Sequence, residues 1–267
     1  MTMSEKGIFD VSGKVALVTG ASRGLGRVFA EVLAEYGADV CCIGRDRAML
    51  AETVELIAGY KHRAIAIVAD VSVPGEVQRM AEETVRQLGK IDILINNAGI
   101  GGVNNRIHEM PIEDWDEVMG TNLRSQFLCM KAVLPFMLEN KGGSIVNIAS
   151  NAGIRAEGSS IPASYGVSKA GIISLTQYAA LQYVRDNIRV NAIAPGMHGS
   201  NLGHPKDPEL SRQLDKALQE FCAANVPMAR MADASELKGL TILLASNASS
   251  YITGQVFVED GGQTTKF

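Results

Sequence analysis

Seven short, continuous apolar runs recur along this chain, and longer amphipathic segments separate most of them. The runs end in Gly, Asp, Asn or Ser and cover residues 14–20, 38–44, 63–70, 91–99, 143–150, 188–196 and 254–262. Runs of this kind are typical of strands that are buried on both faces, as in a parallel sheet. The amphipathic segments cover 25–36, 46–58, 75–88, 113–138 and 164–185. The alternation predicts an α/β fold, a doubly wound sheet of seven mostly parallel strands flanked by helices.

No linker, repeat or low-complexity tract divides the chain, so we expect residues 1–267 to form one domain. Apolar residues make up 46% of the sequence, which suffices for a substantial core. The most irregular stretch is 196–208, and a helical pattern follows it at 209–225. We expect 197–225 to form a mobile flap over a site. In sheets of this type ligands bind beyond the carboxyl ends of the strands.

The charge and cysteine patterns argue against several classes of protein. The net charge is −4 and the basic residues are scattered, so neither a nucleic acid nor a membrane is an expected partner. No apolar stretch approaches the ~18 residues of a transmembrane helix, and the first ten residues lack the apolar core of a secretory signal. The cysteines, Cys41, Cys42, Cys129 and Cys222, have neither zinc-site nor disulfide spacing. We expect a cytoplasmic protein without a metal site.

The sequence TGASRGLG, residues 19–26, joins the first predicted strand to the first predicted helix. We expect Gly20 to allow a tight turn, Gly24 to let the backbone approach a pyrophosphate, and Gly26 to let the helix pack closely on the sheet. The N terminus of that helix would present free amides to the phosphates. The glycine spacing is slightly wider than in the common dinucleotide fingerprint, but its place between a strand and a helix favours a dinucleotide site.

The end of the second predicted strand, CCIGRD, indicates which nicotinamide cofactor fits. A cofactor without a ribose 2′-phosphate is usually held by an acidic residue there, whereas this chain has Gly44 followed by Arg45. A small residue and a cation would admit and neutralise a 2′-phosphate, and Arg23 could supply a second cation. We therefore expect NADP(H), with NAD(H) held through Asp46 as the alternative. Both arginines could instead be solvated surface charges.

Tyr165 and Lys169, in YGVSK, are four positions apart, so on a helix they share a face. They could be a half-buried aromatic residue and a solvated charge, or a tyrosine whose proton the lysine makes mobile. A free tyrosine has a pKa near ~10, and tuning it to neutrality requires a shift of ~3 units, or ~4 kcal/mol. One cation at ~4 Å in an effective dielectric of ~20 supplies about that much. If a site surrounds the pair, we expect Lys169 to lower the Tyr165 pKa toward physiological pH.

Six motifs, in order along the chain, resemble those of the short-chain dehydrogenase/reductase family. They are TGASRGLG, NNAG at 96–99, TN at 121–122, Ser150, YGVSK and APG at 194–196. The resemblance extends from about residue 12 to the C-terminus. It implies a single-domain Rossmann-like fold and hydride transfer between a nicotinamide and a secondary alcohol or ketone. It also implies assembly as a homotetramer or homodimer.

The resemblance further implies roles for individual residues. Tyr165 resembles the general acid/base, Lys169 the residue that lowers its pKa and holds the nicotinamide ribose, and Ser150 the residue that hydrogen-bonds the substrate oxygen. Asn122 resembles the residue that positions a water linking Lys169 to solvent. The expected cofactor contacts are Gly20, Ser22, Arg23, Gly24, Leu25, Gly26, Arg45, Asp70, Val71, Asn97, Ala98, Gly99, Tyr165, Lys169, Pro195, Gly196 and Ser200. The expected substrate contacts are Ser150, Tyr165, Asn151, Met197 and His198.

Some of these positions have rival interpretations. Ser159, Ser160 and Ser164 compete with Ser150, which is preferred because it directly ends a buried strand. Asn122 could simply bond to backbone inside a helix. The asparagines of NNAG are expected to brace the sheet rather than touch substrate, and His198 could be a solvated loop residue.

The polar stretches 100–106, 151–157 and 197–225 favour a small polar substrate, such as a sugar, polyol or oxo-acid. Reduction of 3-oxoacyl groups on a carrier protein is the enzymatic alternative, although Glu139 opposes Lys141 where carrier-binding relatives tend to show a basic run. A catalytically silent cofactor sensor or scaffold is the alternative of another class, but it would usually have lost Tyr165 or Lys169.

Overall fold

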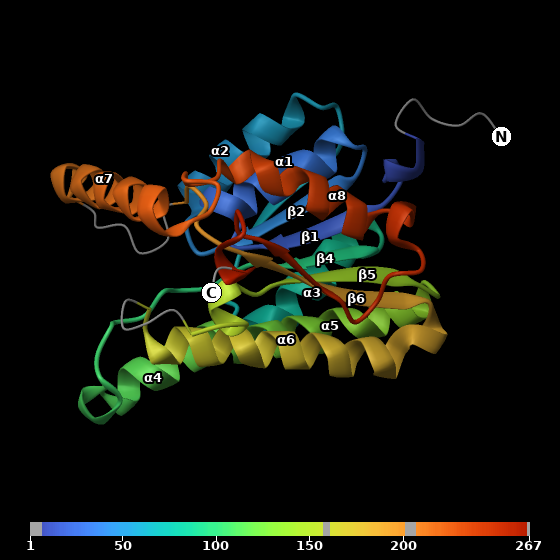
Figure 1. The fold of residues 1–267 in the computed structure, drawn as a ribbon. Helices are drawn as coiled ribbons and strands as arrows, with labels where there is room; N and C mark the ends of the chain where they lie inside the picture. The colour runs from blue at the N-terminus through green and yellow to red at the C-terminus, as the bar shows by residue number, and fades with distance from the viewer. Residues whose placement is uncertain (1–6, 157–160, 201–206, 266–267) are drawn as a thin grey trace.

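A computed structural model describes residues 7–156, 161–200 and 207–265 of the chain. In this part of the chain, one sheet of seven strands forms the centre of the molecule (Figure 1). The strands are β1 Val15–Thr19, β2 Asp39–Gly44, β3 Ala64–Val68, β4 Ile93–Asn96, β5 Gly143–Ile148, β6 Ile188–Pro195 and β7 Val256–Glu259. Their order is β3-β2-β1-β4-β5-β6-β7, and each neighbouring pair is parallel. The predicted doubly wound parallel sheet is confirmed.

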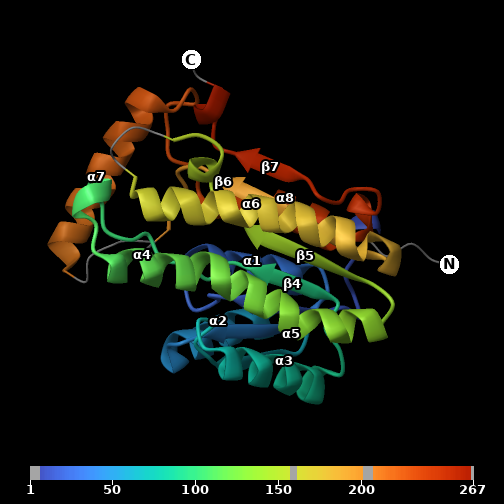
Figure 2. The ribbon, with the colours of Figure 1, turned by 90° about the horizontal axis from the view of Figure 1, so that it is seen from below.

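Helices cover both faces of the sheet. They are α1 Gly24–Glu35, α2 Arg47–Ala58, α3 Pro74–Leu88, α4 Ile112–Val118, α5 Ser125–Glu139, α6 Ala163–Tyr183, α7 Pro208–Asn225 and α8 Lys238–Ala245. Helices α1, α2 and α8 lie on one face, and α3, α5 and α6 lie on the other (Figures 1 and 2). None of the helices in the described ranges is long and apolar enough to cross a lipid bilayer.

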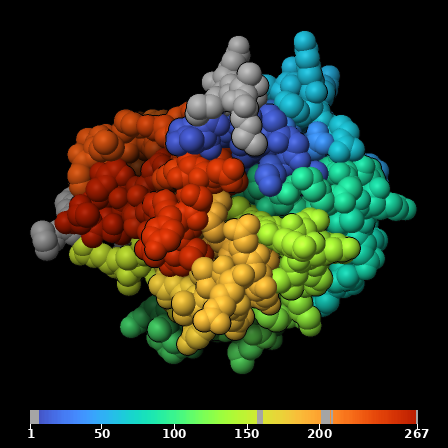
Figure 3. All heavy atoms as spheres, turned by 90° about the vertical axis from the view of Figure 1, so that its right-hand side faces the viewer, coloured from blue at the N-terminus to red at the C-terminus, as the bar shows by residue number. Residues whose placement is uncertain are grey.

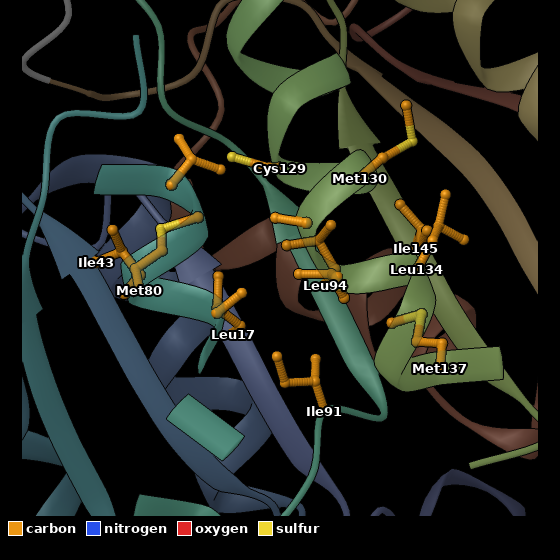
Figure 4. Packing of buried hydrophobic residues seen from close by; sticks show 14 of the residues in the cluster. Leu17, Ile43, Met80, Ile91, Leu94, Cys129, Met130, Leu134, Met137 and Ile145 are labelled. Atoms are coloured by element: carbon orange, nitrogen blue, oxygen red, sulfur yellow. The ribbon is translucent and has the colours of Figure 1, made fainter. Parts of the chain in front are cut away.

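The alternation of side chains along each strand builds two cores. In β1, Val15 and Leu17 pack into the cluster under α3, α5 and α6, whereas Ala16 and Val18 pack into the cluster under α1, α2 and α8. Figure 4 shows the first cluster, where Leu17 and Leu94 of the sheet face Met80 and Met137 from the helices. Because both faces are covered, every residue of β1 is buried, which explains why the strand has no polar alternation.

Two helical regions differ from the sequence prediction. The segment predicted as one helix over 113–138 is divided into α4, a π-helical turn at Met119–Arg124, and α5. Such turns insert an extra residue that hydrophobic periodicity does not reveal. Helix α8 was not predicted at all, because KGLTILLA is a short apolar run without a clear helical stripe.

The strand order reverses between β1 and β4, which predicts the position of a ligand crevice. Strands β2 and β3 lie on one side of β1, and β4 to β7 lie on the other, so the loops after β1 and β4 diverge. Helix α7 projects from the body on the left of Figure 1, the side on which the strands end. Figure 3 views the opposite side, at the amino ends of the strands, where gold, red and lime segments from distant parts of the chain lie side by side. Chemistry is therefore expected at the carboxyl ends.

Candidate active site

A cavity of about 650 Å³ opens at the carboxyl ends of the strands. Every residue that the sequence analysis assigned to cofactor binding lines it, together with Ser150. Residues that were not assigned also line it: Gly44, Asp46, Met49, Ala69, Ile100, Gly101, Thr121, Ile148 and Ala149. These side chains come from the ends of at least five strands, so only the sheet brings them together.

The glycine-rich turn between β1 and α1 contains two glycines in left-handed conformations and a third that packs directly against backbone. Gly24 has φ +56°, a left-handed conformation that residues with a side chain rarely adopt. At Gly26, a Cβ would lie 2.1 Å from the Gly20 carbonyl oxygen, so α1 sits against the turn with no room for a side chain. The turn expected at Gly20, which has φ +68°, and the packing expected at Gly26 agree with this geometry, while the approach of Gly24 to a pyrophosphate stays a prediction.

The N terminus of α1 lies at the cavity, and no side-chain cap occupies this end of the helix. Its N-cap residue Arg23 makes no side-chain cap hydrogen bond, and no acidic residue occurs in the first turn of this fully described helix. Free amides and the helix dipole attract anions at such an end. Together with the glycines, this end has the form of a pyrophosphate cradle.

The end of β2 combines a missing side chain with an exposed cation. A Cβ on Gly44 would lie 2.3 Å from the Ser22 hydroxyl oxygen, so a side chain there would require Ser22 to move. The guanidinium of Arg45 lies 3.6 Å from an Asp70 carboxylate oxygen, and its side chain is 73% exposed. Asp46 instead caps α2, where its carboxylate accepts a hydrogen bond from the Met49 amide at 3.1 Å.

The Asp70 carboxylate, expected to accept from an adenine, has protein partners of its own. One oxygen accepts from the Ser72 amide at 2.9 Å and from the Ser72 hydroxyl at 2.7 Å. Partial burial acts to raise its pKa, but these hydrogen bonds and the charge of Arg45 outweigh that effect and lower the pKa. Asp70 is therefore a fixed anion that orients Arg45 at this end of the cavity.

Tyr165, Lys169 and Ser150 meet at the other end. Tyr165 and Lys169 lie in α6, and Ser150 follows β5. The Lys169 ammonium donates a 2.8 Å hydrogen bond to the Ile148 carbonyl, two residues before Ser150, and lies 5.5 Å from the centroid of the Tyr165 ring. Lys169 is only 4% exposed, and the Ser150 hydroxyl lies close enough to the Tyr165 phenol to act on its pKa. The pair is thus part of a built site rather than a half-buried ring beside a solvated charge.

Burial shifts both titratable groups of this end. It lowers the pKa of Lys169 to about 8. It raises the pKa of Tyr165, and the interaction with Ser150 opposes that rise only in part. From the sequence, Lys169 was expected to lower the Tyr165 pKa toward neutrality. In the protein by itself that expectation is wrong, because desolvation of the phenolate dominates and only the interaction with Ser150 opposes it.

Asn122 lies fully buried in the π-helical turn. Its side-chain oxygen accepts from the Ile100 amide at 2.8 Å, and its side-chain nitrogen donates to the Ile100 carbonyl at 2.9 Å and to the Ser168 hydroxyl at 3.1 Å. Ser168 in turn donates to the Tyr165 carbonyl at 2.7 Å. The side chain therefore ties the loop after β4 to α6, which is the bracing alternative that the sequence left open. The expected role of Asn122 in positioning a water that links Lys169 to solvent stays a prediction.

The asparagines of NNAG brace the sheet, as expected. Asn97 donates to the Thr19 carbonyl at 2.9 Å, and Asn96 donates to the Asn147 side chain at 2.9 Å. Asn147 donates onward to Thr176 of α6 at 2.9 Å. These bonds link β1, β4, β5 and α6 directly beneath the cavity.

Three of the expected substrate contacts lie elsewhere than in the lining of the large cavity. Met197 and His198 line a separate cavity of about 70 Å³. The His198 ring is buried, with Nε2 3.2 Å from a Glu259 carboxylate oxygen and Nδ1 3.3 Å from the Gly196 carbonyl oxygen, so it is not a solvated loop residue. Asn151 is 5% exposed and donates to Gln263 at 3.1 Å.

Other expectations fall partly or wholly outside the described residues. Ser159, Ser160 and Glu157 lie there, as does 201–206 of the expected flap. Ser164, the remaining rival of Ser150, is buried in α6 but does not line the large cavity.

Two functional contacts were missed. The Ile148 carbonyl that holds Lys169 belongs to the main chain, so no residue type signals it. Gln263 is distant in sequence from the residue it contacts, and its only signal is the Gly-Gly pair before it, which predicts a turn at that position.

Comparisons with known proteins agree with this geometry. A family model described as Enoyl-(Acyl carrier protein) reductase matches residues 20–264. The chain is 36% identical over 256 residues to the uncharacterized oxidoreductase YxbG of Bacillus subtilis, covering 94% of this chain and 91% of that protein. It is 38% identical over 250 residues to the 3-oxoacyl-(acyl-carrier-protein) reductase FabG of Staphylococcus aureus, covering 93% of this chain and 97% of that protein.

Solved structures show the same fold over nearly the whole chain. A short-chain type dehydrogenase/reductase from Mycobacterium marinum has a TM-score of 0.89 and 35% identity, covering 97% of this chain and 98% of that one. A gluconate 5-dehydrogenase from Burkholderia cenocepacia, in complex with NADP and tartrate, has a TM-score of 0.87 and 31% identity, covering 97% of this chain and 98% of that one.

Proposed function

The chain belongs to the short-chain dehydrogenase/reductase family, and we propose that within this family it is an NADP(H)-dependent oxidoreductase of small polar carbonyl compounds and alcohols. The observation that carries the proposal is the meeting of Ser150, Tyr165 and Lys169 at one end of a glycine-lined cavity. At the other end lie the uncapped amides of α1 and a cation beside a missing side chain. These features fit a pyrophosphate and a phosphorylated ribose.

The roles of the side chains follow from their positions. The cavity would hold a nicotinamide cofactor, whose chemistry would be hydride transfer to or from the substrate carbon. In reduction, Tyr165 donates its phenolic proton to the carbonyl oxygen, and the Ser150 hydroxyl hydrogen-bonds the same oxygen. In oxidation, Tyr165 takes the proton back. Lys169, held by the Ile148 carbonyl, keeps a positive charge beside the phenol and hydrogen-bonds the cofactor ribose.

Asn122 takes part by holding the loop after β4 against α6, and we propose that the π-helical turn around it leaves room for a water that leads protons toward Lys169. Pro195, Gly196 and Ser200 form the wall after β6 that would face the nicotinamide. Gly99 also lines the cavity, and it packs closely on Asn122, because a Cβ there would lie 3.0 Å from the Asn122 side-chain oxygen.

The preference for NADP(H) over NAD(H) is supported at the end of β2. An NAD-type site needs a free carboxylate for the ribose 2′-hydroxyl, but Asp46 caps α2. Gly44 leaves space, and Arg45 is exposed and oriented by Asp70, which suits a 2′-phosphate. The Burkholderia structure was solved with NADP, which is consistent with this preference.

A small polar substrate is supported by an exposed cation after Ser150 and by one neighbour. Arg155 follows the catalytic serine by five residues and is exposed, and its guanidinium approaches the Thr264 carbonyl at 3.5 Å. The Burkholderia enzyme is a gluconate 5-dehydrogenase that was crystallised with tartrate. We propose a hydroxylated or acidic substrate such as a sugar, polyol or oxo-acid.

Reduction of 3-oxoacyl groups on a carrier protein is the second candidate, because the Staphylococcus relative at 38% identity is named for that activity. We further propose a single domain with a substrate flap at 197–225, a homotetramer or homodimer, and a cytoplasmic location.

The test is cofactor oxidation by the purified protein with NADPH and NADH, over sugars, oxo-acids, diketones and 3-oxoacyl esters, beside Tyr165→Phe. We expect turnover with NADPH on an oxo-acid or keto-sugar and a fall of at least about a hundredfold in Tyr165→Phe. Turnover only of 3-oxoacyl esters would favour the second candidate. Tight NADPH binding without turnover of any compound would favour a cofactor sensor.

A further inference from the structure

A chain of hydrogen bonds runs from the C-terminal turn to the catalytic serine. The Asn151 side-chain nitrogen donates to the Gln263 side-chain oxygen at 3.1 Å. The Ser150 hydroxyl donates to the Asn151 side-chain oxygen at 3.3 Å and accepts from the Ala152 amide at 3.2 Å. The Ser150 hydroxyl also lies beside Tyr165 and acts to lower its pKa. Gln263 is thus linked through Asn151 to the hydroxyl beside the acid/base.

The C-terminal turn is built to hold Gln263 in place. Gln263 begins a 3-10 turn, Gln263–Thr265, and is only 7% exposed. Its amide donates to the Asp260 carbonyl at 3.1 Å. The Asp260 carboxylate accepts from the Gly262 amide at 2.9 Å and from the Thr264 amide at 2.7 Å. One buried carboxylate therefore fixes the backbone on both sides of Gln263.

Gly196 joins this turn to the cavity wall. A Cβ at Gly196 would lie 2.6 Å from the Asp260 Cβ and 3.4 Å from the Asn151 side-chain nitrogen. The residue after the catalytic serine, the turn after β6 and the C-terminal turn are consequently packed against one another. Figure 1 shows the red C-terminal turn, Gln263–Thr265, beside the segment that follows β5.

The direction of the Asn151 amide decides where the serine proton points. The amide of asparagine carries its donor and acceptor on opposite sides of the Cβ–Cγ bond, so a nitrogen held by Gln263 turns the oxygen toward Ser150. Reversal of the amide would present a donor to Ser150 and redirect its single hydroxyl hydrogen toward Tyr165. The 3.3 Å bond from Ser150 is long for a hydroxyl donor, so a substrate oxygen can take over that hydrogen at low cost.

We propose that Gln263 is a positioning residue, which acts through Asn151 to hold the Ser150 hydroxyl ready for the substrate oxygen. The inference rests on the proposed function, because it needs Ser150 to contact the reacting oxygen. It assigns a role in catalysis to the C-terminal turn, which contributes no residue to the lining of the large cavity.

The test compares Gln263→Met, which removes the acceptor at similar length, with Gln263→Glu, which keeps an oxygen acceptor. We expect Gln263→Met to lower kcat about five- to tenfold, the factor that one neutral hydrogen bond typically represents. Gln263→Glu is expected to restore most of that loss. The KM for NADPH should stay unchanged in both variants, because neither touches the cofactor wall directly.

A double-mutant cycle tests the path. If Gln263 acts through Asn151, Gln263→Met causes no further loss of kcat in an Asn151→Ala background. Gln255→Met is the matched control, since that glutamine is exposed and its side chain donates to the Thr253 carbonyl at the other end of β7. We expect wild-type kcat in the control.

Each contrary result has its own meaning. An unchanged kcat in Gln263→Met, or losses that multiply in the double variant, would overturn the positioning role while turnover by the wild type and its dependence on Tyr165 remained. A rise in NADPH KM together with a lower melting temperature in both Gln263 variants would show that Gln263 has a purely structural role. That result would also overturn the positioning role. Absence of turnover in the wild type, or full activity in Tyr165→Phe, would instead overturn the proposed function and this inference with it.

Discussion

The ammonium of Lys169 lies 5.5 Å from the centroid of the Tyr165 ring while it donates to the Ile148 carbonyl at 2.8 Å. The side chain that approaches the phenol is therefore held by the strand that carries Ser150. Burial lowers the Lys169 pKa to about 8, which means that the buried ammonium destabilises the folded state. Function and stability should oppose each other at this position.

Lys169→Met is expected to abolish activity and to stabilise the fold at neutral pH. The folded pKa of about 8 lies below the ordinary 10.5, so between these values the unfolded state binds more protons and the stability of the wild type rises with pH. The difference between these two pKa values corresponds to about 3 kcal/mol of unfolding free energy that the wild type loses below pH 8. The Ile148 carbonyl is not orphaned, because Gln126 also donates to it at 3.3 Å.

Urea unfolding of both proteins at pH 7 and pH 10 measures this effect. The gain in unfolding free energy should be largest at pH 7 and should shrink by pH 10. If the variant were less stable than the wild type at pH 7, the conclusion that the buried Lys169 ammonium destabilises the fold would be wrong.

Ser150→Ala is expected to lower kcat about a hundredfold or more, because it removes a donor to the developing oxyanion. Ser164→Ala, which changes a buried serine next to Tyr165 that does not line the cavity, should keep kcat within about threefold. Steady-state kinetics with saturating NADPH makes the comparison. Equal losses in the two variants would reopen the choice between these serines.

Arg45→Ala is expected to raise the KM for NADPH about ten- to a hundredfold, because the 2′-phosphate loses a charge-assisted hydrogen bond. The KM for NADH should change little. Arg47→Ala is the control, since Arg47 is also exposed, lies in the first turn of α2 and does not line the cavity. An equal rise of both KM values in Arg45→Ala would argue against recognition of a 2′-phosphate.

Gly26→Ala is expected to destabilise the protein by about 1–3 kcal/mol and to weaken NADPH binding, because its methyl would lie 2.1 Å from the Gly20 carbonyl oxygen. Gly75→Ala, with no atom within 4 Å of the new methyl and a helical position in α3, should stabilise by about 0.5–1 kcal/mol. Urea unfolding and fluorescence titration with NADPH would check both. A stable, tightly binding Gly26→Ala would show that α1 can move away from the turn.

Local patterns were sufficient for most elements and insufficient where packing overrides periodicity. The fully apolar VALVT of β1 predicted a strand covered on both faces, and the sheet confirms it. The π-helical turn around Asn122 lies between α4 and α5, and nothing in the helical pattern over 113–138 marked it. KGLTILLA was missed because eight residues carry too few turns to show a helical stripe.

The same distinction holds at the candidate site. The four-residue spacing of Tyr165 and Lys169 and the place of Ser150 at a strand end are local facts, so the sequence predicted that these three side chains meet. Their protonation was not predictable, because burial depends on everything packed around α6, and it raised the Tyr165 pKa where a charge argument alone had lowered it.

The sequence by itself determined the order of strands and helices, the glycine turn and the spacing of the acid/base pair, since each depends on neighbours within a few residues. Only the tertiary structure decided that Arg45 faces Asp70, that His198 turns to Glu259, and that Gln263 reaches Asn151 across 112 residues. The physical reason is that a parallel sheet aligns the carboxyl ends of strands that are far apart in the chain. Side chains there choose partners by proximity and burial, which the sequence does not encode locally.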